Sequence, residues 1–205
     1  IKILPFALRA PHDLKQAKEI LMHCKYQRIS EDLKFSELCF RYQVPEETFN
    51  RCLDVMRTGW PKKTTDNIPC MQIQGTGDAK DYLWVKLPPH DKRALILGKI
   101  TNCCQSIGGH SERCVLDAVS LSDNGLYVLL KPRKKGQFPS PIVNKEINEA
   151  EYKIVAQSYV WLSETGNLCL DSLEYLKIDV SVEALQSILR DFARELLRTQ
   201  PGIKV

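Results

Sequence analysis

The feature that most constrains the fold is a pair of apolar segments near the C-terminus, followed by one amphipathic stretch. Residues 154–162 and 168–173 are mainly apolar, and the polar turn 163–167 between them contains Gly166. Such a turn between two apolar runs is typical of a β-hairpin. Ser181 is a helix-capping residue type, and apolar residues then recur at helical spacing. These residues are Val182, Leu185, Leu189, Phe192 and Leu196. The pattern predicts a sheet covered by one amphipathic helix.

Three upstream segments add to this sheet. Residues 69–74 and 82–87 alternate apolar and polar side chains around a turn at 75–78, which predicts a second hairpin. A turn signal at 123–125 precedes the apolar run 126–130, which predicts a further strand. We therefore expect an α/β (α+β) protein with a mixed or antiparallel sheet and flanking helices. Asp91 is the expected N-cap of a short helix through Leu97.

The first sixty residues are expected to be helical. Apolar side chains recur at helical spacing over 14–21, 31–39 and 46–58, with Ser30 as cap and Pro45 in a first-turn position. The polar segment 62–67 is the best linker candidate. We predict a helical N-terminal region over residues 1–66 and an α/β domain over residues 67–205. The latter is expected to be incomplete at its C-terminus, because residues 203–205 look like the start of another strand.

Composition and charge exclude several classes of protein. Hydrophobic residues make up 43% of the 205-residue chain and charged residues 26%, as in ordinary globular proteins. A chain of this length buries a sizeable core, so no cofactor is expected to be required for folding. The net charge of +4 is too small to indicate nucleic-acid binding. Apolar runs are far shorter than the roughly 20 residues that span a bilayer, so no membrane span is expected.

Eight cysteines raise the choice between disulfides, metal ligands and free thiols. Cys39, Cys52 and Cys169 fall at apolar positions of periodic segments, as small buried hydrophobic residues do. No basic start followed by an apolar run is visible. We therefore expect reduced thiols in a reducing compartment such as the cytoplasm.

The segment 101–114 holds three of these cysteines, Cys103, Cys104 and Cys114, together with His110. Adjacent cysteines point in different directions and no Cys-x-x-Cys pair is present, so no metal site is expected. Cys103 or Cys104 as a nucleophile, with His110 as its base, would make the protein a cysteine-dependent hydrolase or transferase. The alternative is structural, with thiols in the core or in a loop and a glycine turn beside them.

The order of elements expected from residue 82 onward is strand, helix, helix or loop, three strands in a meander, helix and the start of a strand. This order resembles the first part of the GNAT acyltransferase fold. The resemblance implies that acetyl-CoA or another acyl-CoA binds beside the strand 168–173, with its pyrophosphate at the N-terminus of the following helix. The residues that it places at the cofactor are Leu173, Ser181 and Val182, with Arg133 and Lys134 adding charge from the loop before the hairpin.

One segment departs from the GNAT pattern. That family has a glycine-containing loop between this strand and this helix, whereas residues 177–183 contain no glycine. Side chains there hinder close approach of a phosphate to the backbone, and the carboxylates of Asp179 and Glu183 oppose an anion.

An acyl transfer also needs a group that accepts the proton of the amine. Glu112, Asp171 and Glu174 are the carboxylates that we predict as candidate bases near the groove. Gln157 and Ser158 lie in an apolar strand. Since an unpaired buried polar group is costly, we expect both side chains to be hydrogen-bonded or to line a cleft.

The amino-acid sequence of residues 91–174 is similar to that of uncharacterised bacterial proteins, among them translocated effectors of intracellular pathogens. This resemblance implies a second function class, a non-catalytic effector domain that binds a host protein or peptide, and a host cytosol as a second location. The resembling residues are Leu97-Gly98, Thr101-Asn102-Cys103-Cys104-Gln105, Gly108-Gly109, Glu112, Cys114, Ala156-Gln157-Ser158, Trp161 and Asp171-Ser172-Leu173-Glu174.

Overall fold

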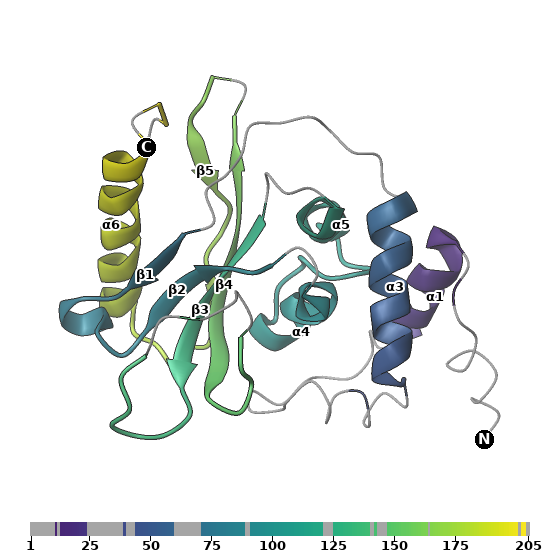
Figure 1. The fold of residues 1–205 in the computed structure, drawn as a ribbon, viewed down its shortest axis with the longest axis horizontal. Coiled ribbons are helices and arrows are strands. Elements are labelled where there is room, and N and C mark those ends of the chain that lie inside the picture. The colour runs from purple at the N-terminus through teal and green to yellow at the C-terminus, as the bar shows by residue number, and fades with distance from the viewer. Residues whose placement is uncertain are drawn as a thin grey trace. The chain divides into compact units, whose positions relative to one another are not determined.

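The computed structural model is an α/β structure with an antiparallel sheet and flanking helices, which confirms the predicted fold class (Figure 1). It describes residues 11, 13–23, 39, 44–59, 71–88, 91–120, 125–139, 142, 147–163, 165–200 and 202–203. The chain forms two compact units, of which the first comprises Ile1–Thr64 with Pro89–Ser122 and the second Thr65–Pro88 with Asp123–Val205. Residues 89–122, which we had assigned to the second domain, thus belong to the first unit. The domain boundary at residue 66 stays a prediction.

The first unit is helical. Its elements are α1 (Leu14–His23), α3 (Glu46–Gly59), the 3-10 helix η3 (Lys92–Ile96), α4 (Leu97–Thr101) and α5 (Glu112–Ser120). α3 covers the predicted range 46–58 and ends at Gly59, and it buries Phe49, Cys52, Leu53 and Met56. Asp91 caps η3, because its carboxylate accepts a hydrogen bond from the Arg93 N–H. The helix predicted at 31–39 lies outside the described residues except for Cys39.

The second unit is built on the sheet. Its strands are β1 (Gln72–Gln74), β2 (Leu83–Lys86), β3 (Gly125–Pro132), β4 (Tyr152–Leu162), β5 (Leu168–Leu170) and β6 (Glu174–Tyr175). The strand order is β1-β2-β3-β4-β5, with β6 also paired to β4, and every pairing is antiparallel. Both predicted hairpins are confirmed. The β1–β2 connection contains a 3-10 turn, η2 (Gly77–Ala79).

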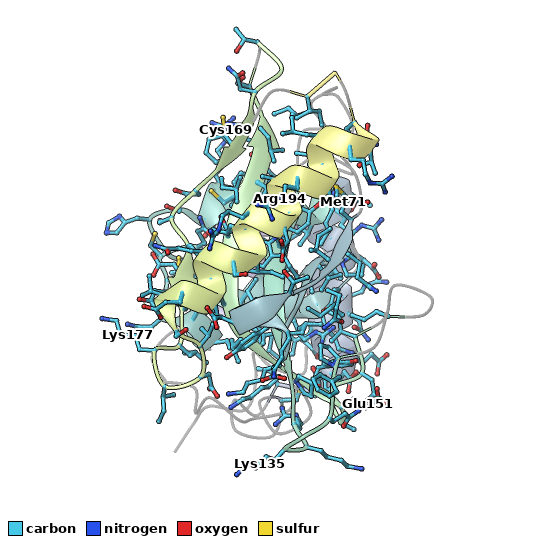
Figure 2. All side chains as sticks on the ribbon, turned by 90° about the vertical axis from the view of Figure 1, so that its left-hand side faces the viewer. Met71, Lys135, Glu151, Cys169, Lys177 and Arg194 are labelled. Atoms are coloured by element: carbon cyan, nitrogen blue, oxygen red, sulfur yellow. The ribbon has the colours of Figure 1, made fainter. Side chains whose placement is uncertain are left out.

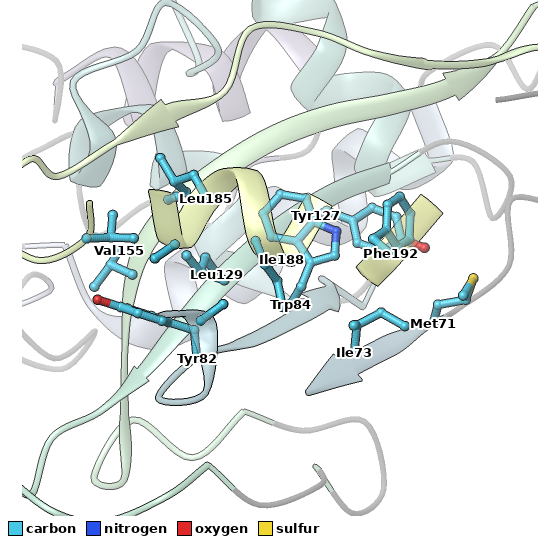
Figure 3. Close-up of a cluster of buried hydrophobic side chains, with 14 of the residues drawn as sticks. Met71, Ile73, Tyr82, Trp84, Tyr127, Leu129, Val155, Leu185, Ile188 and Phe192 are labelled. Carbon is cyan, nitrogen blue, oxygen red and sulfur yellow. The ribbon is translucent and has the colours of Figure 1, made fainter. Parts of the chain in front are cut away.

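The helix α6 (Val182–Thr199) covers one face of this sheet (Figure 2). Ser181 is its N-cap as predicted, with the side-chain oxygen accepting a hydrogen bond from the Ala184 N–H at 3.2 Å. Beneath the helix, the rings of Trp84, Tyr127 and Phe192 form the centre of the core (Figure 3). Trp84 stacks on Tyr127 with 5.7 Å between ring centroids, and Phe192 lies 5.1 Å from Tyr127. Ile203 is not in a strand, and residues 204–205 of the predicted strand lie outside the described residues.

Candidate functional site

The edge of the sheet formed by β5 and β6 contains a β-bulge. Val160 of β4 pairs with Leu170 of β5, and Gln157 pairs with Glu174 of β6. The two positions on β4 are three residues apart (160 − 157), whereas their partners are four residues apart (174 − 170). One extra residue is therefore inserted between β5 and β6. The sequence predicted one uninterrupted strand here, and that prediction was wrong in this detail.

A hydroxyl from the neighbouring strand holds the bulge. Ser158 is fully buried, and its Oγ donates to the backbone carbonyl of Asp171 at 2.9 Å. The Asp171 N–H donates to the Tyr159 carbonyl at 2.8 Å, and the Asp171 carboxylate accepts from the Ser172 N–H at 2.8 Å. The expectation that Ser158 is hydrogen-bonded is thus confirmed. The N–H of Leu173, the next residue, donates to no acceptor within the described part of the chain.

The N-terminus of α6 offers further backbone donors. The Ser181 hydroxyl uses the Ala184 N–H, but the N–H groups of Val182 and Glu183 have no acceptor among the described residues. Ser181, Val182 and Glu183 are all exposed. Free N–H groups and the positive end of the helix dipole together favour an anion at such a position.

A charged cluster precedes this helix. The Asp179 carboxylate lies 2.5 Å from the Lys153 ammonium and 3.3 Å from that of Lys131. Lys131 also donates to the Asp179 carbonyl at 2.9 Å, and the Tyr82 hydroxyl donates to the same carbonyl at 2.7 Å. Burial, together with the negative charges of Asp179 and Asp81, raises the pKa of Tyr82 above its usual value of 10.0. The negative charge that we expected at Asp179 is therefore offset by two lysines.

The predicted basic residues Arg133 and Lys134 lie just after β3. The Arg133 side chain braces the backbone, since its Nε donates to the carbonyls of Glu149 at 2.7 Å and Tyr152 at 3.3 Å. Lys134 is exposed. Lys134 is therefore the more accessible of the two charges.

The three candidate bases fall in different settings. Asp171 and Glu174 flank Leu173 in the second unit, and both are half-buried. The Glu174 carboxylate has no hydrogen-bond or ion-pair partner in the described residues. Glu112 belongs to the first unit, where it forms an ion pair with Lys18 and accepts from the Gly108 N–H at 2.7 Å.

The cysteine-rich segment forms a tight loop between α4 and α5. A side chain at Gly109 would place its Cβ 2.0 Å from the Cys104 carbonyl oxygen, so this glycine is sterically required. The Cys103 sulfur accepts from the Gln105 N–H at 3.3 Å, and the Cys104 sulfur lies 3.2 Å from the Ser111 hydroxyl. His110 is exposed, and within the described segments it is hydrogen-bonded to neither thiol. The loop is therefore closed by its own contacts.

The remaining cysteines divide by burial. Cys39 and Cys52 are buried as predicted, whereas Cys169 on β5 is only half-buried. Cys103 and Cys114 are likewise half-buried, and Cys104 is exposed. The described residues contain no group of three or more His, Cys, Asp or Glu side chains placed to hold a metal ion.

Sequence reasoning found the capped helix but missed the cluster around Asp179. Its members, at positions 82, 131, 153 and 179, are spread over nearly 100 residues. No local pattern joins them, because only the strand pairing brings them together. Lys131 and Lys153 are register partners of β3 and β4, so a correct strand alignment was the one signal available.

The chain matches no protein-family model, no curated protein and no solved structure. None of the helices in its described part combines the length and apolarity needed to cross a membrane. The site therefore has to be interpreted from its own geometry.

Proposed function

We propose that the second unit is an acyl-CoA-dependent N-acyltransferase-like domain of a bacterial effector-type protein. The supporting observation is a set of backbone N–H groups without acceptors among the described residues, one at the bulge and two at the start of α6. The bulge leaves the Leu173 N–H without an acceptor among the described residues, and the chain then enters α6, whose first two N–H groups are likewise without one. A thioester carbonyl and a pyrophosphate are the two parts of acyl-CoA that need such donors.

In this proposal the donor's phosphates meet the N–H groups of Val182 and Glu183. Asp179 is no obstacle, since Lys131 and Lys153 carry two positive charges against its one negative charge. Lys134 adds an exposed positive charge from the β3–β4 connection, while Arg133 stabilises that connection. The exposed Glu183 carboxylate remains an opposing charge, so we expect modest affinity for the donor.

The chemical step is attack by an amine nitrogen on the thioester carbonyl carbon. A C–N bond forms and the C–S bond breaks, and the sulfur leaves as the thiol of CoA after taking up a proton. The Leu173 N–H stabilises the negative charge that develops on the carbonyl oxygen. Glu174 accepts the proton of the attacking amine, because its carboxylate has no other partner in the described residues. Asp171 is already hydrogen-bonded to the bulge.

Substitution of Ser181 tests the donor site. Acetyl-CoA at millimolar concentration should raise the melting temperature of the wild-type chain, because a ligand that binds only the native state stabilises it. Ser181→Asp keeps a capping side chain but adds a negative charge, so it should abolish this shift without lowering the melting temperature itself. Ser181→Ala loses the cap, at a cost of about 1 kcal/mol, but should keep the shift.

A thiol variant separates this proposal from a cysteine mechanism. Replacing Cys103 and Cys104 with Ser should leave the acetyl-CoA shift intact, because both lie in the first unit. A shift that survives Ser181→Asp and disappears in the cysteine variant would refute the proposed donor site. No shift in the wild type would favour the non-catalytic, protein-binding alternative.

A further inference from the structure

The turn between β6 and α6 is held by an ionic cluster around Asp179. Its residues, 176–180, are tied to three other strands or strand ends through Asp179. The Asp179 side chain is only 8% exposed, so this is a buried ionic contact. The turn's own hydrogen bonds run from the N–H groups of Asp179 and Val180 to the Leu176 carbonyl, at 2.8 and 3.2 Å.

The groups around Asp179 hold its carboxylate, its backbone carbonyl, or both. Lys153 on β4 binds the carboxylate, and Tyr82 before β2 binds the backbone carbonyl. Lys131 on β3 binds both, and its ammonium also lies 6.0 Å from the centre of the Tyr82 ring. The backbone carbonyl two residues before the Ser181 cap thus accepts two hydrogen bonds.

We infer that Asp179 is a positioning residue for the donor site, which it orders through the turn that leads into α6. The inference rests on the proposed function. Asp179 is not one of the groups proposed to contact acyl-CoA. Its contacts instead fix where α6 starts, and so where the N–H groups of Val182 and Glu183 point. Breaking a buried ion pair by removing one partner leaves the other charges uncompensated, so the restraint should be lost rather than weakened.

The direction in which Asp179→Asn changes the KM for acetyl-CoA distinguishes a positioning role from simple charge repulsion. If Asp179 only opposed the anionic donor, Asp179→Asn would raise the local positive charge and lower the KM for acetyl-CoA. A positioning role predicts the opposite, a higher KM for the donor with an unchanged KM for the amine and little change in kcat. A purely structural role would lower the melting temperature without this split.

Hydrogen exchange provides a readout that needs no activity. In Asp179→Asn, the amides of Leu176, Val180 and Leu185 should exchange about ten to a hundred times faster, the scale expected for loss of hydrogen bonds to a charged group. The amide of Phe192, further along α6, should not change. Unchanged exchange at the turn would overturn the inference.

Two further variants keep the test valid if Asp179→Asn misfolds, and a third variant serves as the control. Tyr82→Phe and Lys131→Met each remove part of the restraint, and both should change exchange and donor KM in the same direction as Asp179→Asn. Asp191→Asn is the matched control, because Asp191 of α6 binds Thr76 through its carboxylate at 2.7 Å without touching the turn. It should leave donor KM and exchange at the turn unchanged.

The outcomes separate the two proposals. A wild-type chain with no turnover refutes the proposed function and with it the role of Asp179 in positioning the acyl-CoA site, whatever the exchange data show. Turnover with a lower donor KM in Asp179→Asn keeps the proposed function and overturns the positioning role. Faster exchange at the turn together with a higher donor KM supports both.

Discussion

Cys52 and Cys104, two of the eight cysteines, show how burial decides the reactivity of a thiol. Cys52 is fully buried on α3, and burial raises the pKa of its thiol from 9.0 to about 12. Cys104 is exposed in the α4–α5 loop. Helical spacing was enough to predict the burial of Cys52. It could not show which thiol of the pair at 103 and 104 faces solvent, because a tight loop has no period.

We predict that a thiol-alkylating reagent at pH 8 modifies Cys104 of the folded protein and leaves Cys52 unmodified. The thiolate is the reactive form, and Cys52 is both inaccessible and protonated at this pH. Peptide mass spectrometry after brief treatment checks this, with denatured protein as the control in which both react. Equal modification of both thiols in the folded state would contradict the burial of Cys52.

Since its pKa is raised on folding, Cys52 contributes stability that is present below pH 9 and is lost as the pH rises toward 12.

At the scale of elements, capping and hairpin signals predicted those elements whose determining residues lie beside them in the sequence. The Ser181 cap and the turn at 163–167 lie beside the elements that they define, and both were predicted. The bulge between β5 and β6 was not, because the side chains of 168–173 are compatible with one continuous strand. The bulge is stabilised by a contact across the sheet, in which the buried Ser158 hydroxyl donates to the Asp171 carbonyl.

We expect Ser158→Ala to destabilise the protein by about 1 kcal/mol or more, because it leaves a carbonyl of the bulge without its donor. Ser187→Ala is the control, since the Ser187 hydroxyl on α6 makes an equally simple bond to the Thr76 carbonyl but at an exposed position. Its loss should cost less than about 0.5 kcal/mol. Urea unfolding measures both. Equal midpoints for the two variants would mean that the hydroxyl does not hold the bulge.

For the whole molecule, the two compact units do not follow one another along the chain. A polar linker at 62–67 suggested two consecutive regions, but residues 89–122 return to the helical unit. The reason is packing, since η3 and α5 both contact α3. Composition along the chain cannot show such a return, because it depends on contacts between segments far apart in sequence. The fold class, by contrast, follows from local periodicity and was predicted correctly.

The most direct test of the account is transfer of an acetyl group from acetyl-CoA to an amine by the wild-type chain and by Glu174→Gln. The acetylated amine should be followed by mass spectrometry, because the eight cysteines of the chain would react with a thiol reagent. We predict product above the enzyme-free blank with at least one primary amine of a panel. We expect its rate to fall by about a hundredfold or more in Glu174→Gln, as for loss of a general base. No product with any amine, or equal rates for the two proteins, would contradict the account.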